Sequence, residues 1–217
     1  MSQSYFIIGT DTNVGKTYIA SALVKEFVGL GFKTIGMKPV ASGCQYNENH
    51  ELINEDVTAL MKVSNVTSTL DAINPYRFIS AIAPHIAAEQ AGVSIDLEVI
   101  ANAYQMLTRL AEVVIVEGAG GLLVPLNATQ TLADLVKLLN IPIILVVGMR
   151  LGCINHALLT IELIKARGLN LAGWVANEID PNMSMFEDNL SSLQQRISAP
   201  CLGVVRWQGQ ANFTLAS

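Results

Sequence analysis

The segment GTDTNVGKT, residues 9–17, has the residue types of a phosphate-binding loop. Its end, Gly15-Lys16-Thr17, fits the P-loop pattern G-x-x-x-x-G-K-[ST], but the first glycine stands one position early, at Gly9. Backbone N–H groups at a helix N-terminus, together with the helix dipole, attract anions. Lys16 would add a positive charge at the terminal phosphates, and Thr17 a hydroxyl for Mg²⁺. The segment therefore predicts a nucleotide site, with a glycine-rich turn and an incidental lysine as the alternative.

A nucleotide site with magnesium also needs carboxylates, and two candidates follow along the chain. Glu117 ends the β-branched run VVIVE and precedes GAGG, whose glycines allow the backbone to approach a ligand closely. Asp56 opens a predicted helix after a long polar loop. The alternatives are an ordinary glutamate at a strand end for the first and a plain helix-start acid for the second.

Lys38, in the segment KPVASG, is a candidate for stabilising charge during phosphoryl transfer. It ends a predicted strand at the sheet edge where a γ-phosphate would lie, and a cation there would stabilise developing negative charge. Ser42 and Gly43 follow closely and could hydrogen-bond a ligand. The alternative for Lys38 is a solvated lysine at a strand end.

Other reactive residues give weaker signals. His85 and His156 could act as acid–base groups, but each is expected to pack or hydrogen-bond at the start of a helix. Cys153 is expected to be a small buried residue. No Ser/His/Asp or Cys/His set can be assembled, and the chain lacks the G-x-G-x-x-G pattern of a dinucleotide site.

Apolar runs alternate with helical patterns, and this alternation must position the candidate residues. Strands are expected at residues 5–8, 33–40, 113–117, 142–148, 171–177 and 201–205. Helices are expected at residues 16–30, 55–61, 84–90, 96–112, 132–139, 155–167 and 183–197, with residues 41–54 as a long loop. The pattern predicts one α/β domain over residues 1–217, with a mostly parallel sheet flanked by helices on both faces, of the P-loop NTPase type. Ligands of such folds bind at the carboxyl ends of the strands.

The amino-acid composition argues against a membrane-spanning protein and against a nucleic-acid-binding protein. The 217 residues are 51% hydrophobic, yet the longest apolar run, residues 141–149, is far shorter than the roughly 20 residues of a spanning helix. Strands buried on both faces explain the apolar content. A net charge of −5 without a basic cluster argues against nucleic acid as a partner.

The cysteines and the N-terminus bear on location. The three cysteines contain no C-x-x-C pair, so neither a zinc site nor a disulfide framework is indicated. The N-terminus enters a predicted strand at once, without a charged leader. A reduced, cytoplasmic protein with no membrane partner is therefore expected.

Seven blocks in order, GTDTNVGKT, KPVASG, NPYRF, APHIAA, VEGAGGLLVPL, LVVGMRLGCINHALLT and GWVAN, closely resemble the dethiobiotin synthetase family. The resemblance runs from about residue 5 to about residue 205. It implies an ATP- and Mg²⁺-dependent ligase that converts 7,8-diaminononanoate and CO₂ into dethiobiotin through a carbamate and a carbamic-phosphoric mixed anhydride. It also implies a homodimer whose substrate lies across the subunit interface.

Carried over block by block, the resemblance implies a role for each motif residue. Lys38, Lys16 and Thr12 would be catalytic, and Thr17, Asp56 and Glu117 would hold the metal. The residues expected at the nucleotide are Asn13, Val14, Gly15, Lys16, Thr17, Tyr18, Asp56, Glu117, Gly118, Ala119, Gly120, Asn177 and Glu178. Those expected at the substrate are Ser42 and, from the partner subunit, Gly152, Cys153 and Asn155.

The chain departs from the family pattern in three places. Asn13 stands where a glutamate is common, Arg206 where a proline usually precedes Trp207, and the tail QGQANFTLAS does not match. These changes predict altered selectivity for the nucleotide base. Two further readings remain open: a nucleotide switch that binds partners, against which Asp11 argues because that group has a lysine there, and another ligase on the same scaffold.

Overall fold

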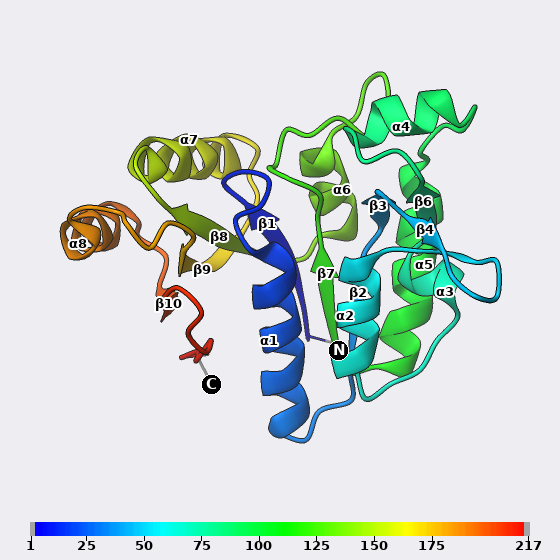
Figure 1. The fold of residues 1–217 in the computed structure, drawn as a ribbon, viewed down its shortest axis with the longest axis horizontal. Coiled ribbons are helices and arrows are strands. Elements are labelled where there is room, and N and C mark those ends of the chain that lie inside the picture. Colours follow the sequence, from blue (N-terminus) through cyan, green and yellow to red (C-terminus); the bar gives the residue numbers. More distant parts are fainter. Residues whose placement is uncertain (1–2, 215–217) are drawn as a thin grey trace.

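A parallel sheet forms the centre of the computed structural model, which describes residues 3–214 (Figure 1). Its strands lie in the order β10-β9-β8-β1-β7-β2, and all neighbouring pairs are parallel. They are β1 (Gln3–Gly9), β2 (Thr34–Met37), β7 (Val113–Glu117), β8 (Ile143–Met149), β9 (Leu171–Glu178) and β10 (Cys201–Val205). Because all six strands run the same way, their carboxyl ends meet at one edge, where β1 continues into the phosphate loop.

The central strands are buried on both faces, as the continuous apolar runs predict. Every residue of β7 and β8 is buried. Successive residues of a strand point to opposite faces, and along β7 Val114 and Val116 join one hydrophobic core while Val113 and Ile115 join the other. This explains a hydrophobic fraction of 51% in a protein of this length.

Helices complete both layers (Figure 1). On one face α1 (Lys16–Gly29) packs with α2 (Glu55–Val63). The core of the other face includes side chains of α5 (Leu97–Leu110), α6 (Leu132–Leu139), α7 (Cys153–Ala166) and α8 (Phe186–Arg196). A capping box between Thr131 and Asp134 starts α6. None of the helices within residues 3–214 has both the length and the apolar character needed to cross a bilayer.

The structure corrects one predicted strand. Residues 33–40 do not form a single strand, because the chain leaves the main sheet after β2 and continues as β3 (Val40–Ser42). This strand pairs with β6 (Tyr76–Phe78) in a separate two-stranded sheet. Pro39 lacks an N–H for a ladder, and its carbonyl accepts instead from the N–H of Tyr76 at 3.1 Å. Lys38 therefore lies at a break between two sheets.

Other expectations differ from the structure in detail. Residues 41–54 contain, besides the end of β3, the antiparallel hairpin of β4 (Gln45–Tyr46) and β5 (Leu52–Ile53). The short helix α3 (Leu70–Ile73) and strand β6 had no predicted counterpart. The helix α4 (Pro84–Gln90) has the predicted bounds, whereas α7 begins at Cys153 rather than at residue 155 and α8 at Phe186 rather than at residue 183.

Candidate active site

The phosphate loop joins β1 to α1 and lies against the end of β9. Gly15 caps α1 with a φ of 86°, a left-handed backbone that favours glycine. A Cβ at this position would collide with the side-chain amide of Asn177. That amide donates a hydrogen bond to the carbonyl of Val14 at 2.8 Å. The loop therefore needs glycine here both for its backbone angle and for its close approach to β9.

The middle of the loop explains the unusual Asn13. Its φ is 58°, in the left-handed region where asparagine is several-fold enriched over other non-glycine residues. Nearby, Asp11 accepts from the N–H of Thr12 at 2.7 Å and pairs with Arg150 at 2.5 Å. The ion pair ties the loop to the segment after β8. Asp11, where the switch proteins have a lysine, thus helps to hold the loop's shape.

Lys16 is largely buried, and its Nζ donates to the carbonyl of Asp11 at 3.1 Å. Burial and the nearby Lys38 lower the pKa of Lys16 to about 8, although Glu117, Asp56 and Asp11 act in the opposite direction. A lysine poised near neutral pH is a strong anion ligand only while it keeps its proton. Phosphate binding at this loop should therefore depend on pH in the range around 8.

Lys38 is not a solvated strand end. Its Nζ lies 2.7 Å from Glu117 Oε1, 2.8 Å from Asp56 Oδ2 and 3.3 Å from the carbonyl of Gly118. Lys38 is 5% exposed and Glu117 1% exposed. Burial alone would lower the pKa of Lys38, but Glu117 and Asp56 outweigh it, so this pKa lies above its ordinary value. Lys38 is thus a firmly protonated cation at the carboxyl end of the sheet.

The oxygens around Lys38 fit a divalent cation. Thr17 Oγ1 lies 2.7 Å from Asp56 Oδ1 and 2.7 Å from Glu117 Oε1, although a hydroxyl can donate its single proton to only one of them. Glu117 Oε2 is buried and has no hydrogen-bond partner. Such hard oxygens are the ligands that Mg²⁺ prefers, usually with phosphate and water oxygens filling the remaining positions. The donor set therefore suits Mg²⁺ bound together with a nucleotide.

A hollow of about 900 Å³ brings most of the predicted residues together. Ser42 lies in its wall, and its hydroxyl oxygen is buried without a hydrogen-bond partner. The lining comprises Thr12, Asn13, Gly15, Lys16, Thr17, Lys38, Val40, Ser42, Asp56, Ala81, Ile82, Ala83, Pro84, Glu117, Ala119, Gly120 and Val124. The phosphate loop and both predicted carboxylates thus open into a space next to Ser42.

A second hollow, of about 420 Å³, lies on the other side of the loop, between Tyr18, Asn177 and residues 205–209. The N–H of Trp207 donates to Glu178 Oε2 at 2.9 Å, and the hydroxyl of Tyr18 donates to the carbonyl of Gly209 at 2.8 Å. Its position next to the phosphate loop and its aromatic walls suit a nucleotide base.

Comparison with known proteins identifies the family. Residues 3–213 match the model of a family described as an AAA domain. A protein of Nitrosospira multiformis named ATP-dependent dethiobiotin synthetase is 50% identical over 205 residues, which cover 94% of this chain and 88% of that protein. One of the same name from Cellvibrio japonicus is 48% identical over 215 residues, covering 99% and 94%. The chain belongs to the dethiobiotin synthetase family. Its membership makes it an enzyme of the ligase class.

Solved structures confirm the fold class. A ParA family ATPase from Chlorobium tepidum superposes with a TM-score of 0.59 at 12% identity, covering 97% of this chain and 91% of that one. The septum site-determining protein MinD of Pyrococcus horikoshii, complexed with Mg-ADP, gives 0.57 at 14%, covering 95% and 82%. At such identities the likeness concerns the fold alone, which is that of the P-loop NTPases.

The residues that the family resemblance assigns to the partner subunit do not line either hollow. Gly152 caps α7 with a φ of 95°, Cys153 is buried as expected, and Asn155 is exposed. Beside them Leu151 is 91% exposed. Gly152 and Asn155 thus face solvent in the single chain while Cys153 does not, and the contact of these residues with substrate stays a prediction.

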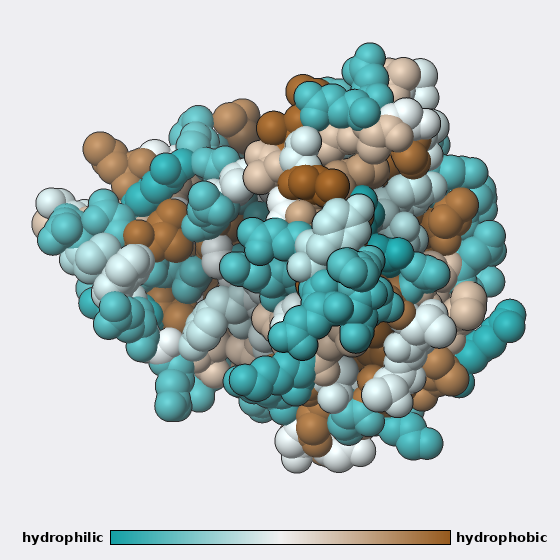
Figure 2. Space-filling model, turned by 45° about the vertical axis from the view of Figure 1, so that its right-hand side comes forward, coloured by the Kyte–Doolittle hydropathy of each residue, from teal (hydrophilic) through white to brown (hydrophobic). Residues whose placement is uncertain are grey.

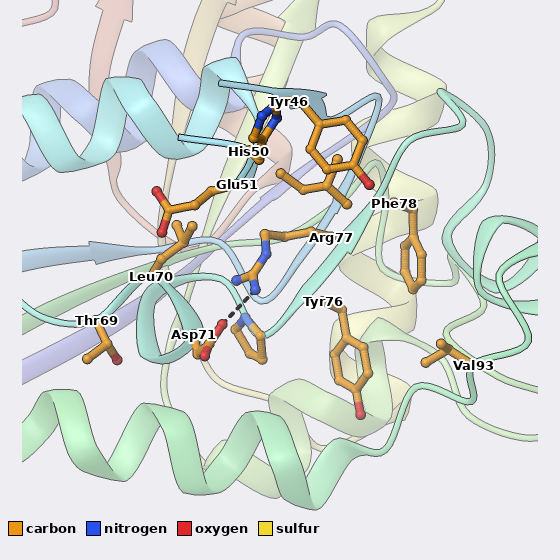
Figure 3. A pocket seen from close by; sticks show the side chains of 12 residues that line it. Tyr46, His50, Glu51, Thr69, Leu70, Asp71, Tyr76, Arg77, Phe78 and Val93 are labelled. Atoms are coloured by element: carbon orange, nitrogen blue, oxygen red, sulfur yellow. Dashed lines mark hydrogen bonds and ion pairs between the residues drawn. The ribbon is translucent and has the colours of Figure 1, made fainter. Parts of the chain in front are cut away.

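Residues 81–84 and Val124, which had no predicted role, line the larger hollow. Residues 205–209, whose departure from the family pattern predicts altered base selectivity, line the smaller one. A third hollow, of about 810 Å³, lies beside the β4–β5 hairpin (Figure 3). In it the guanidinium of Arg77 pairs with Asp71 at 2.6 Å. The block APHIAA was the available signal for residues 83 and 84, and NPYRF for the third hollow, because both blocks match the family without an assigned role.

Proposed function

We propose that this enzyme makes dethiobiotin from 7,8-diaminononanoate, CO₂ and ATP, with Mg²⁺, in biotin biosynthesis. The observation that carries the proposal is the contact of Lys38 with both Asp56 and Glu117, beside the end of the phosphate loop. Phosphoryl transfer needs positioning and neutralised charge more than covalent catalysis, and these residues supply both. The names and 50% and 48% identities of the two dethiobiotin synthetases support the choice of substrate.

The nucleotide binds along the phosphate loop. Residues 13–18 hold its phosphates through backbone N–H groups and Lys16, and Asn177 with Glu178 contacts the base end. Thr17, Asp56 and Glu117 hold Mg²⁺, which neutralises charge on the phosphates. The unpartnered Oε2 of Glu117 supports this assignment. Gly118, Ala119 and Gly120 lie where backbone can approach the phosphates or the substrate.

The chemistry proceeds in three steps. An amine nitrogen of the substrate bonds to CO₂ and loses a proton, which gives a carbamate. A carbamate oxygen then attacks the γ-phosphorus, and the bond to the β–γ bridging oxygen breaks, so that ADP leaves and a mixed anhydride forms. The second amine attacks the carbonyl carbon, the C–O bond to phosphate breaks, a proton is lost and the ring closes.

The residues of the larger hollow serve these steps. Lys38 and Lys16 offset the negative charge of the carbamate and of the transferred phosphoryl group. Thr12 lies at the reacting end of the phosphate loop, and Ser42 offers its free hydroxyl to the substrate. Because water would destroy the anhydride, the site must be closed during turnover.

A partner subunit supplies that closure in a homodimer. The first turn of α7, with Gly152, Cys153 and Asn155, binds the substrate carboxylate of the other protomer, where the helix dipole favours an anion. The exposed Leu151 supports an interface there. Figure 2 shows apolar surface gathered at the top of the molecule, the region in which Figure 1 places α4. A partner would cover such a surface.

The whole chain, residues 1–217, works as one ligase domain in the cytoplasm, without a nucleic-acid or membrane partner. The net charge of −5 argues against nucleic acid. The thiols of Cys44, Cys153 and Cys201 have pKa values raised by burial, which suits structural residues in a reducing compartment.

The test of this function is diamine-dependent release of ADP. With ATP, Mg²⁺ and ¹³C-bicarbonate, the protein should release one ADP for each ¹³C-labelled dethiobiotin detected by mass spectrometry. ADP release that requires a different amine or acid would indicate another ligase. Protein that binds ATP without any diamine-dependent ADP release would indicate a nucleotide switch and contradict the proposal.

The shared site has its own test. Lys38→Met should inactivate the protomer that holds ATP, and Asn155→Glu should repel the substrate carboxylate of the neighbouring protomer. Mixed in equal amounts and allowed to exchange subunits, the two inactive variants form heterodimers with one intact site. About a quarter of wild-type activity should return, because statistical pairing makes half of the dimers mixed. No recovery after proven exchange would place both residues in one protomer's site.

A further inference from the structure

The main chain of Lys38 is held on both sides by one segment, the end of α3. The N–H of Lys38 donates to the carbonyl of Ile73 at 2.9 Å. Its carbonyl accepts from Nδ2 of Asn74 at 2.5 Å, and Asn74 is completely buried. Lys38 lies between β2 and Pro39, outside both ladders, so these two hydrogen bonds replace the pairing that a sheet would have given it.

The contacts of Asn74 fix which way its amide faces. Nδ2 also donates to the carbonyl of Tyr76 at 3.1 Å. Two carbonyl acceptors require the NH₂ side of the amide, because a carbonyl cannot donate. The Oδ1 atom is then left buried without a hydrogen-bond partner. The position demands two N–H donors on a short side chain and tolerates an unsatisfied acceptor to obtain them.

A second set of contacts holds Asn74 itself. Its N–H donates to the carbonyl of Leu70 at 2.7 Å, and its carbonyl accepts from Nη1 of Arg77 at 2.6 Å. The other terminal nitrogen of Arg77 makes the ion pair with Asp71 that crosses the third hollow (Figure 3). Contacts thus run without a gap from the surface carboxylate of Asp71 to the main chain of Lys38.

We propose that Asn74 is a positioning residue for Lys38, and that Arg77 with Asp71 keeps Asn74 in place. The inference rests on the role proposed above for Lys38. The ammonium of Lys38 contacts Asp56 and Glu117 within 2.8 Å, and a displacement of its main chain would move it relative to the reacting phosphoryl group. A misplacement of about 1 Å at a reacting centre can cost about 100-fold in rate.

The test compares kcat and KM in Asn74 variants. Asn74→Ala removes both donors, and kcat per ATP-binding site should fall about 10- to 100-fold. The KM for ATP should change by less than about threefold, because Asn74 forms no hydrogen bond with the phosphate loop, which keeps its own hydrogen bonds. Asn74→Ser keeps one donor, so its kcat should lie between that of the wild type and that of Asn74→Ala. Sites are counted by stoichiometric ATP binding, so that misfolded protein does not enter kcat.

A double-mutant cycle shows whether Asn74 acts through Lys38. In a Lys38→Met background, Asn74→Ala should cause no further loss of the residual rate, because the group that it positions is gone. Arg77→Met should lower kcat by a smaller factor than Asn74→Ala. The matched control is Lys165→Met, which breaks an exposed ion pair with Glu162 of 2.9 Å and should leave kcat unchanged.

The outcomes separate this inference from the proposed function. Wild-type kcat in Asn74→Ala beside an inactive Lys38→Met would overturn the positioning role alone. The positioning role would also be overturned if the fold loss of kcat in the double variant equalled the product of the losses in Asn74→Ala and Lys38→Met. The two residues would then act independently. An active Lys38→Met would contradict both the positioning role and the role of Lys38 itself.

Discussion

The two ends of the proposed nucleotide site differ in how they are built. At the phosphate end, Lys38 and Glu117 are 5% and 1% exposed and contact each other at 2.7 Å. At the base end, Trp207 is 48% exposed, and residues 205–209 form one side of the hollow. In the proposed assignment, the chemistry would take place at buried side chains, and the base would be held at an exposed rim.

The sheet order explains only the burial of Glu117, because Lys38 follows β2, which is an edge strand like β10. Lys38 is buried there by contacts with Asp56 of α2 and with residues 73 and 74. Strands β1 and β7 are neighbours in the interior of the sheet, so their carboxyl ends are enclosed by other elements.

Strand β10 is an edge strand, and the segment that follows it hydrogen-bonds to Glu178 and Tyr18. Arg206 adds two exposed contacts to this segment. Its guanidinium lies 3.2 Å from the carboxylate of Glu187 and 4.0 Å from the centre of the Phe186 ring.

Among the changes that test the difference between the two ends, Lys38→Met should have the largest effect on kcat. Removing a preorganised charge from the reacting centre should lower kcat about 10²- to 10³-fold. The Kd for ATP should stay within a few-fold of wild type, because the phosphate loop is unchanged. ADP release and ATP titration on the same preparation measure the two effects. A near-normal kcat would mean that the buried end does not carry the chemistry.

A smaller effect is expected from pH at Lys16. With a pKa of about 8, Lys16 loses its proton as the pH rises from 7 to 9, and a neutral amine binds phosphate poorly. The Kd for ATP should therefore rise about tenfold over this range, since about one lysine in ten keeps its proton at pH 9. The dependence should disappear in Lys16→Met. Equal Kd values at pH 7 and pH 9 in the wild type would show that Lys16 does not titrate there.

The smallest effect is expected at the base end. Arg206→Pro removes two ion pairs, with Glu178 and Glu187, and a contact over the Phe186 ring. Each of these contacts is worth about 1 kcal/mol or less. The kcat should be unchanged, and the preference for ATP over CTP and GTP should shift by less than about tenfold. Ratios of kcat/KM for the three nucleotides measure the shift. A strong preference of the wild type for ATP would count against altered base selectivity. A large loss of kcat in Arg206→Pro would show that the base end also affects the chemical step, contrary to the proposed difference between the two ends.

The sequence predicts the phosphate end well because its signals are local. Strand, loop and helix follow one another around Lys16, and Glu117 directly follows a buried apolar run. Asn13 could not be explained from the sequence, because its left-handed backbone, with a φ of 58°, has no pattern of its own. Lys38 and Asp56 come together only in the tertiary structure. Their spacing in the sequence therefore could not exclude a solvated lysine at a strand end or a plain acid at a helix start.

Other parts could not be predicted for physical reasons that the structure makes clear. Strand β6 has three residues, too few for a periodic pattern, and it pairs with β3 only because the chain leaves the main sheet at Lys38. The buried role of Asn74 depends on carbonyls at Lys38 and Tyr76, which no side-chain pattern encodes. The contacts of Arg206 likewise join residues from separate elements.

In the proposed mechanism, the phosphoryl group held at the buried end passes to a carbamate rather than to water. Transfer of oxygen isotope tests it most directly. With freshly dissolved C¹⁸O₂ and unlabelled water, the account predicts that the phosphate released with each dethiobiotin carries one ¹⁸O atom, because the carbamate oxygen that attacks phosphorus leaves with it. Phosphate without label from C¹⁸O₂, but with one ¹⁸O when the solvent is H₂¹⁸O, would show transfer to water and contradict the account.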